Sequence, residues 1–321
     1  MSLIKSISGI RGTIGGRAGE NLTPLDIVES TAAYGAMLQK ESTKAKIVIG
    51  RDARMSGAWV QDLCMNTLRA LGIDVVDCGL STTPTVEMAV LAHNAQGGII
   101  LTASHNPRQW NALKLLNENG EFISAAQWEE MLEIARKKDF TFADVDSFGT
   151  LEQDALAINN HIDKILDLDL VQKEMIQSKK FKVLVDCINS TGGLSVVPLL
   201  EKLDCQVTTL NNDLSGDFAH NPEPLPAHLK ETLEEASRGD YDLGIVVDPD
   251  VDRLAFIDEK GEFFGEEYTL VAVADYILAR KKGAAVSNLS SSIALQDVCQ
   301  KHGVEYFSSA VGEVNVVTKM K

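Results

Sequence analysis

The chain has 321 residues, of which 45% are hydrophobic and 24% charged, a balance typical of folded globular proteins and not of disordered ones. This length exceeds that of one ordinary domain and predicts two or three. With 30 basic and 46 acidic residues the net charge is −16, so the surface repels nucleic acid and anionic membranes. A phosphorylated substrate therefore has to be attracted by locally placed arginine, lysine or metal ions.

Neither a membrane span nor a secretion signal is predicted. The apolar stretches are short and are interrupted by glycine, aspartate or lysine. The first six residues lack the apolar core of a signal peptide. Five scattered cysteines form no Cys-x-x-Cys pair, which predicts reduced thiols in a cytoplasmic protein.

One pattern of strand, polar turn, amphipathic helix and second strand occurs three times along the chain. This order predicts parallel strands joined by a crossover helix, and three copies predict three related α/β domains. The first strands of the copies are residues 46–52, 182–186 and 284–288, and the second strands are 73–76, 205–208 and 304–307.

The expected domains are residues 1–150, 151–256 and 257–321. A charged helix at 128–138 closes the first domain, and a helix from about 153 to 176 opens the second. The third ends after one more strand, inside a helix that contains Lys321. Its sheet would then be incomplete, so we expect the sequence to be a fragment.

A candidate nucleophile follows an apolar strand at residues 99–101, in the run Thr-Ala-Ser-His-Asn-Pro at 102–107. Ligands of α/β sheets bind just past the carboxyl ends of strands, and the proline at the end of the run enforces a turn. Ser104 therefore fits a nucleophile or a phosphate carrier. A simpler alternative is that Ser104 and His105 only satisfy turn hydrogen bonds. A Ser-His hydrolase is disfavoured because no Gly-x-Ser-x-Gly elbow is present.

Three carboxylates, Asp248, Asp250 and Asp252, follow the apolar strand at 243–247. At alternating positions of extended chain they share one side, where they repel each other unless a cation compensates them. Oxygen ligands point to Mg²⁺ before Ca²⁺ and well before Zn²⁺. A calcium EF-hand loop is disfavoured because Arg253 stands where that loop needs glycine. A solvated acidic turn is the simpler alternative.

The same residues also fit the Asp-x-Asp-x-[Thr/Val] motif of haloacid-dehalogenase-type phosphatases. In that interpretation Asp248 is the phosphorylated nucleophile. The motif commonly opens its domain, whereas here it lies late in the chain. An aspartyl phosphotransferase of this type remains the alternative enzymatic function.

Taken together, the runs at 102–107 and 248–253 resemble the phosphoserine and metal loops of the alpha-D-phosphohexomutase superfamily. Residues 8–12, Ser-Gly-Ile-Arg-Gly, resemble its N-terminal signature, and Val-Gly-Glu at 311–313 resembles the entry to a loop of its third domain. The resemblance is collinear along the whole chain. It implies four domains, the first three of them α/β, of which this sequence would hold two and an incomplete third, with the fourth absent.

The resemblance implies an intramolecular phosphotransferase that interconverts hexose 1-phosphate and hexose 6-phosphate. Phosphorylated Ser104 would donate its phosphoryl group to glucose, mannose or glucosamine phosphate through a hexose bisphosphate. Mg²⁺ would be held by Asp248, Asp250 and Asp252, with an oxygen on Ser104 as a further ligand.

Other roles follow from the same resemblance. Arg11 and Arg253 would bind phosphate oxygens through their planar donor groups, and His105 would orient the loop. Lys114 is the candidate general acid/base, and we expect burial and a nearby cation to lower its pKa. The simpler alternative for Lys114 is a solvated strand residue. Arg54 and its neighbours are expected to brace a domain interface, and His220 to be structural.

The sequence departs from the family pattern in two respects. Ala112 stands where the family often has glycine, two residues before Lys114. No Gly-Glu-x-x-Gly sugar loop follows Gly312, and no fourth, phosphate-anchoring domain is present in the sequence. We therefore expect the fragment alone to bind metal but to turn over little substrate, and a non-catalytic metal-binding fragment is a further alternative.

Overall fold

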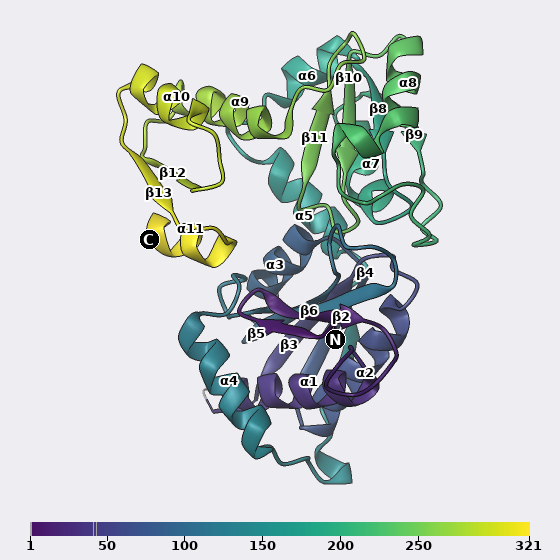
Figure 1. The fold of residues 1–321 in the computed structure, drawn as a ribbon, viewed down its shortest axis with the longest axis vertical. Helices are drawn as coiled ribbons and strands as arrows, with labels where there is room; N and C mark the ends of the chain where they lie inside the picture. The colour runs from purple at the N-terminus through teal and green to yellow at the C-terminus, as the bar shows by residue number, and fades with distance from the viewer. Residues whose placement is uncertain (1, 41, 43) are drawn as a thin grey trace.

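The computed structural model describes residues 2–40, 42 and 44–321. The chain forms three α/β domains in sequence order (Figure 1). Domain I occupies the lower half of the view, domain II the upper right and domain III, in yellow, the upper left. Within the described residues, no helix combines the length and the apolar character needed to cross a bilayer. A cytoplasmic location stays a prediction.

Domain I contains a mixed sheet with the strand order β1-β2-β6-β5-β3-β4-β7. Strands β5, β3, β4 and β7 are parallel, and β1, β2 and β6 run antiparallel to their neighbours. The strands are β1 (Ile4–Ser6), β2 (Gly9–Thr13), β3 (Lys46–Arg51), β4 (Asp74–Leu80), β5 (Gly97–Leu101), β6 (Trp110–Leu116) and β7 (Leu151–Gln153).

Helices cover both faces of this sheet, which is why its central strands are apolar throughout. Helices α1 (Pro24–Gln39), α2 (Gly57–Ala70) and α4 (Ala125–Lys137) share one apolar core with Ile47 and Ile49 of β3. Helix α3 (Thr83–Ala92) packs on the other face, against Val48. Successive side chains of β3 point to opposite faces of the sheet, so the strand contributes to the apolar core on each face. A short 3₁₀ helix, η1 (Val145–Ser147), precedes β7.

Domain II has a smaller sheet in the order β11-β10-β8-β9. Its strands are β8 (Lys182–Asp186), β9 (Gln206–Leu210), β10 (Leu243–Val247) and β11 (Leu254–Ile257), and only β11 is antiparallel to its neighbour. The helices are α5 (Ala157–Leu166), α6 (Lys173–Lys179), α7 (Gly192–Lys202), the 3₁₀ helix η2 (Pro226–His228) and α8 (Lys230–Arg238). The acidic run at 248–253 is the connection between β10 and β11.

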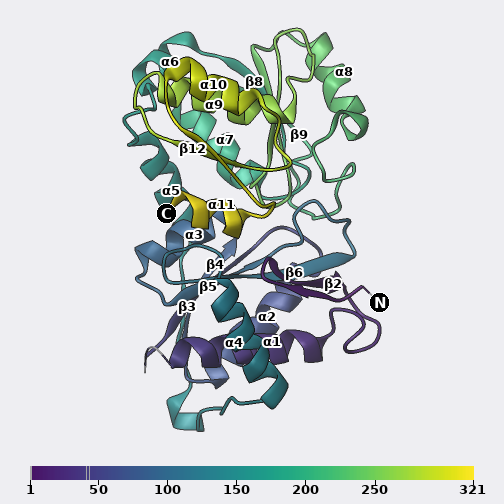
Figure 2. The same ribbon diagram turned by 60° about the vertical axis from the view of Figure 1, so that its left-hand side comes forward.

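Domain III pairs β12 (Ala285–Asn288) with β13 (Tyr306–Ser309) in parallel, beside α9 (Glu266–Leu278) and α10 (Ala294–His302). Its last helix, α11 (Glu313–Met320), turns back toward domain I and lies beside α3 in both views (Figures 1 and 2). There the Lys321 ammonium bonds Glu121 at 2.6 Å. Domain III therefore contacts domain I through its last helix.

The three predicted strand–helix–strand repeats are confirmed as β3–α2–β4, β8–α7–β9 and β12–α10–β13, each with parallel strands. The single helix predicted from about 153 to 176 is wrong. Residue 153, where this helix was expected to begin, belongs to strand β7, which pairs with β4. The remaining residues form two separate helices, α5 and α6. Asp167 and Asp169 lie at the break, where aspartate is a weak helix former and unfavourable at a helix carboxyl end. The domain boundaries at 150/151 and 256/257 stay predictions, and the first two sheets end at Gln153 and Ile257.

A buried carboxylate organises the carboxyl end of β8. Asp186 accepts hydrogen bonds from the Ile188 backbone (3.1 Å), Asn211 Nδ2 (3.0 Å), the Thr232 hydroxyl and His220 Nε2 (3.0 Å). Burial acts to lower the pKa of His220, but its hydrogen bond and charge interaction with Asp186 outweigh burial and raise it. Burial likewise acts to raise the pKa of Asp186, and His220 reverses that effect and lowers it.

The His220–Asp186 pair should make domain II stability depend on pH. The raised pKa of His220 means that its contribution is complete below its ordinary value of 6.5 and is lost as the pH rises through the raised value. The lowered pKa of Asp186 means that the contribution is also lost well below 3.8. His220→Gln should therefore cost about 1.5–3 kcal/mol at about pH 5.5 and clearly less at about pH 9.

Urea unfolding at the two pH values measures this difference. His228→Gln is the matched control, because its ring contacts the backbone carbonyl of Glu223 and, within the described part of the chain, no carboxylate. Equal losses for His220→Gln at both pH values would contradict the ion pair.

Candidate active site

Two loops from different domains meet at the candidate site. The serine loop at 102–107 leaves the carboxyl end of β5, and the acidic loop at 248–253 leaves that of β10. The Ser104 hydroxyl donates a hydrogen bond to Asp248 Oδ2 at 2.7 Å, across 144 positions of sequence. Because this hydroxyl bonds a carboxylate of another domain, turn hydrogen bonds alone do not describe its contacts.

The backbone holds Ser104 in an uncommon conformation. Its φ of 48° lies in the left-handed region, which costs a non-glycine residue roughly 1 kcal/mol or more. Thr102 Oγ1 accepts from the Ser104 N–H at 2.9 Å, and the Asn106 N–H donates to the carbonyl of Ala103 at 2.9 Å. This conformation directs the serine hydroxyl toward domain II.

The acidic loop forms a cluster of ligand atoms. One carboxylate oxygen from each of Asp248, Asp250 and Asp252 lies within 4.8 Å of the others. Asp248 and Asp250 are fully buried, so a solvated turn is wrong, and a strand hairpin surrounds the loop in place of an EF-hand's helices. Among the described residues, Asp250 Oδ1 is buried and has no hydrogen-bond partner. A buried, unpaired carboxylate oxygen in an all-oxygen cluster fits a hard divalent cation.

The charges of this cluster are unevenly distributed. Burial raises the pKa of Asp248, and the neighbouring Asp250 and Asp252 raise it further. Burial also raises the pKa of Asp252, together with the charge of Asp250. The pKa of Asp250 is low in spite of burial, because Lys114 and the Thr83 hydroxyl stabilise its anion. Asp250 is therefore the carboxylate most strongly held in its charged form.

Lys114 reaches the cluster from β6. Its ammonium bonds Asp250 Oδ2 at 2.7 Å and Asp252 Oδ2 at 2.8 Å, and its side chain is only 13% exposed. The solvated-strand alternative is therefore wrong. Burial acts to lower the pKa of Lys114, but the two carboxylates outweigh it and raise the pKa above its ordinary value. This is opposite to the lowering that the sequence led us to expect.

A cavity of about 350 Å³ lies beside these groups, between domains I, II and III. Its lining includes the predicted site residues Ser104, Lys114, Arg11, His105 and Arg253. Residues 311–315 of domain III line it as well. The structure thus brings every predicted site residue to the cavity or to the acidic cluster beside it.

The predicted phosphate-binding residues differ in how they are held. Arg253 Nη1 pairs with Glu223 at 3.2 Å, and its backbone N–H donates to Asp248 Oδ1. Arg11 Nε is buried without a partner among the described residues. His105 Nδ1 lies 3.5 Å from the Ser104 hydroxyl, a marginal contact, and burial followed by the charge of Arg253 lowers the pKa of its ring.

Sequence reasoning missed one residue that contacts the cluster directly. Thr83 donates to Asp250 through its hydroxyl (2.5 Å) and through its backbone N–H, which reaches the Asp250 carbonyl at 2.9 Å. Thr83 is the first residue of α3, whose N-cap Thr82 accepts from the Thr85 backbone. The Ser-Thr-Thr-Pro run at 81–84 signals this helix start, but no local pattern signals its contact with domain II.

Three family models match the chain, and together they cover most of it. They are described as phosphoglucomutase/phosphomannomutase alpha/beta/alpha domain I over residues 3–142, domain II over 159–261 and domain III over 265–321. The models follow the chain in the order of the three domains of the structure.

Curated relatives agree with these models. A phosphoglucomutase/phosphomannomutase of Thermococcus kodakarensis is 34% identical over 310 residues, which are 95% of this chain and 67% of the relative. A probable phosphoglucosamine mutase of Methanopyrus kandleri is 32% identical over 316 residues, 98% of this chain and 67% of the relative. The chain spans about two thirds of the length of these relatives.

Solved structures share the fold. A phosphoglucomutase/phosphomannomutase family protein of Burkholderia thailandensis matches with a TM-score of 0.84 at 24% identity, over 99% of this chain and 69% of that one. An N-acetylphosphoglucosamine mutase of Aspergillus fumigatus, solved with GlcNAc-6P and magnesium, matches with a TM-score of 0.56 at 12% identity, over 99% and 64%. At these identities the likeness concerns the fold alone.

The geometry of the acidic cluster predicts which substitution removes cation binding. Asp250→Asn should weaken Mg²⁺ binding by more than about 100-fold, because it replaces a carboxylate whose buried Oδ1 has no hydrogen-bond partner among the described residues. Isothermal titration calorimetry with Mg²⁺ measures this loss. Asp240→Asn removes an exposed carboxylate that pairs with Lys182 and should leave the affinity unchanged. Wild-type affinity in Asp250→Asn would refute the metal site.

Proposed function

Because the chain belongs to the phosphoglucomutase/phosphomannomutase family, we propose that it acts as a phosphohexomutase that interconverts hexose 1-phosphate and hexose 6-phosphate. The observation that carries this proposal is the 2.7 Å contact between the Ser104 hydroxyl and Asp248. It holds a serine that lines the cavity against a cluster suited to a cation.

Asp248, Asp250 and Asp252 are the residues that would hold Mg²⁺, together with an oxygen on Ser104. The ion, when bound, supplies positive charge that stabilises the transferring phosphoryl group. Phosphoryl transfer needs charge neutralisation and positioning more than covalent help from the protein. The acidic loop would therefore contribute to the reaction by binding the cation.

In the proposed step, the phosphoryl group moves from Ser104 to a hydroxyl of the hexose phosphate. The bond between phosphorus and the serine oxygen breaks as the bond to the sugar oxygen forms. The sugar hydroxyl loses its proton, and the serine oxygen gains one. The bisphosphate then returns its other phosphoryl group to Ser104 by the same exchange in reverse.

The cationic residues of the cavity suit this step. Arg11 and Arg253 line the cavity, and a guanidinium group offers planar, paired donors to phosphate oxygens. Lys114 is our candidate for the proton exchange. Its carboxylate partners favour the ammonium form, which fits the half of the exchange in which a departing oxygen receives a proton. His105 would keep the loop oriented beside Ser104.

The surroundings of Asp248 favour Ser104 over Asp248 as the residue that carries the phosphoryl group. Its Oδ1 accepts from the backbone N–H groups of Asp252 and Arg253, and its Oδ2 accepts from Ser104. A nucleophilic carboxylate needs an oxygen that faces the substrate, whereas both oxygens here are engaged and the residue is fully buried.

The sugar is proposed only as a class. The relatives include a phosphoglucomutase/phosphomannomutase and a probable phosphoglucosamine mutase at similar identity. Glucose, mannose and glucosamine phosphates are therefore the candidates, with the corresponding hexose bisphosphate as the phosphorylating partner.

Treatment with a hexose 1,6-bisphosphate and Mg²⁺ should phosphorylate Ser104. Intact-mass and peptide mass spectrometry should find one phosphoryl group, located on Ser104 and absent from Ser104→Ala. Ser8→Ala removes another serine that lines the same cavity and should be labelled as the wild type is. A label on Asp248, released by hydroxylamine as an acyl phosphate would be, would instead support the aspartyl alternative.

A further inference from the structure

Arg54 lies behind the serine loop and is 1% exposed. All five N–H donors of its guanidinium are engaged. Nε bonds the Asp52 carboxylate at 2.9 Å. The terminal nitrogens donate to four backbone carbonyls of the serine loop and the residues after it: Ser104, Asn106 (2.8 Å), Pro107 (3.0 Å) and Trp110 (3.1 Å).

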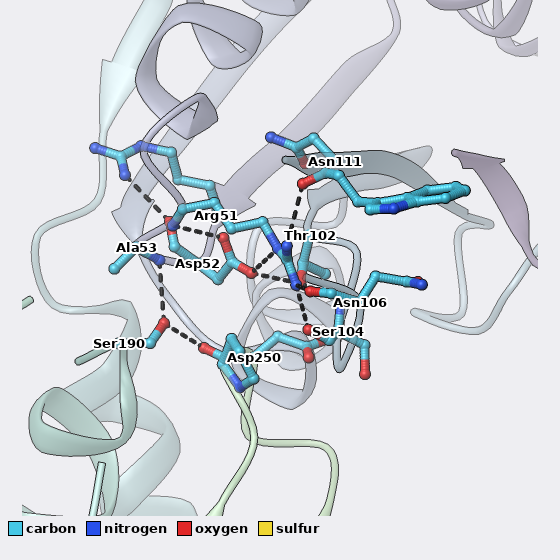
Figure 3. Close-up of polar contacts among 12 residues, drawn as sticks. Arg51, Asp52, Ala53, Thr102, Ser104, Asn106, Asn111, Ser190 and Asp250 are labelled. Atoms are coloured by element: carbon cyan, nitrogen blue, oxygen red, sulfur yellow. Dashed lines mark hydrogen bonds and ion pairs between the residues drawn. The ribbon is translucent and has the colours of Figure 1, made fainter. Parts of the chain in front are cut away.

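These contacts form a closed ring around Ser104. Asp52 Oδ2 accepts from Arg54 and from the Thr102 hydroxyl (2.7 Å), and Thr102 in turn accepts from the Ser104 N–H. The Ser104 carbonyl accepts from Arg54. Both backbone polar groups of Ser104 thus belong to one buried network, and Figure 3 shows Asp52, Thr102, Ser104 and Asn106 gathered around it.

The same segment is joined to the acidic loop. The N–H of Ala53 donates to the Ser190 hydroxyl at 3.2 Å (Figure 3). That hydroxyl donates in turn to the Pro249 carbonyl at 2.7 Å. On the domain II side, the ring of Phe218 lies 5.0 Å from the Arg54 guanidinium carbon. Residues 52–54 therefore bond the loop of Ser104 directly and are joined to the loop of Asp248 through Ser190.

We propose that Arg54 is a positioning residue that sets where Ser104 lies relative to the acidic loop, so that phosphoryl transfer to Ser104 depends on its guanidinium. This inference rests on the proposed function. Arg54 does not line the cavity, so it acts through the serine loop and not on the substrate. The left-handed backbone of Ser104 needs such support, because a strained conformation persists only where its surroundings enforce it.

The test compares single-turnover phosphorylation of Ser104 by a hexose 1,6-bisphosphate with Mg²⁺ in three variants. Arg54→Ala should slow the reaction by about 100-fold, the scale expected for a misplaced reacting group, and should change the half-saturating bisphosphate concentration by less than about threefold. Free guanidinium at a non-denaturing concentration should restore part of the rate, and ammonium at the same ionic strength should not. Arg69→Ala is the matched control, since its guanidinium also bonds a backbone carbonyl of domain I, that of Gly149, far from the serine loop.

Arg54→Lys keeps a positive charge that can pair with Asp52. If Arg54→Ala does not fold, this variant tests the positioning role. An ammonium group cannot reach four carbonyls and a carboxylate in one plane, so this variant should be at least about tenfold slower. A wild-type rate in either variant, or a loss in folded Arg54→Ala that guanidinium does not restore, would overturn the positioning role. An unlabelled wild-type protein would overturn the proposed function itself.

Discussion

Repulsion among three carboxylates is the constraint on which the centre of this molecule depends. Asp248, Asp250 and Asp252 lie within 4.8 Å of one another, and two of them are fully buried. Like charges this close cannot all ionise without nearby positive charge. Lys114 supplies one such charge from another domain, and the uneven pKa shifts show that it compensates Asp250 most strongly. Among the described residues Asp250 Oδ1 has no hydrogen-bond partner, which fits the binding of a further cation.

This constraint explains why domains I and II meet as they do. The carboxyl ends of β5 and β10 face each other, so that the serine loop can donate to Asp248 and α3 can begin against Asp250 through Thr83. Buried polar groups are costly unless they are paired, and Ser104, Lys114 and Thr83 of domain I each pair with a carboxylate of domain II. The junction is therefore specific: a small rotation of one domain would break many hydrogen bonds at once.

The surface as a whole and the cavity differ in charge. The chain as a whole carries −16, which disfavours the approach of any anion. The cavity, however, is lined by Arg11, Lys114 and Arg253, so a phosphate would meet positive charge there. Glu313 of α11 lines the same cavity, and burial raises the pKa of its carboxyl. Domain III thus adds a polar wall to a site that is otherwise built by the first two domains.

The sequence by itself determined the repeated strand–helix–strand units and the two chemical loops. Both kinds of information are local: hydrophobic periodicity reports which face of a strand or helix is buried, and the motifs at 102–107 and 248–253 each follow an apolar strand. The expected parallel pairing of each repeat is present in the structure. Ser104 and the three carboxylates could be chosen for the same reason, whereas the roles of Arg11, Lys114 and Arg253 followed from the family resemblance.

Only the tertiary structure decided how these parts act on one another. The direction of the Lys114 pKa shift depends on carboxylates 136 and 138 positions away, and Arg54 reaches the Ser104 carbonyl across 50 positions. Gln153, where the sequence predicted the start of a helix, instead ends strand β7, which pairs with β4. Such contacts arise when domains pack together, and no window of neighbouring residues contains them. Local chemistry therefore identified the groups, and packing set their charge, their partners and their position.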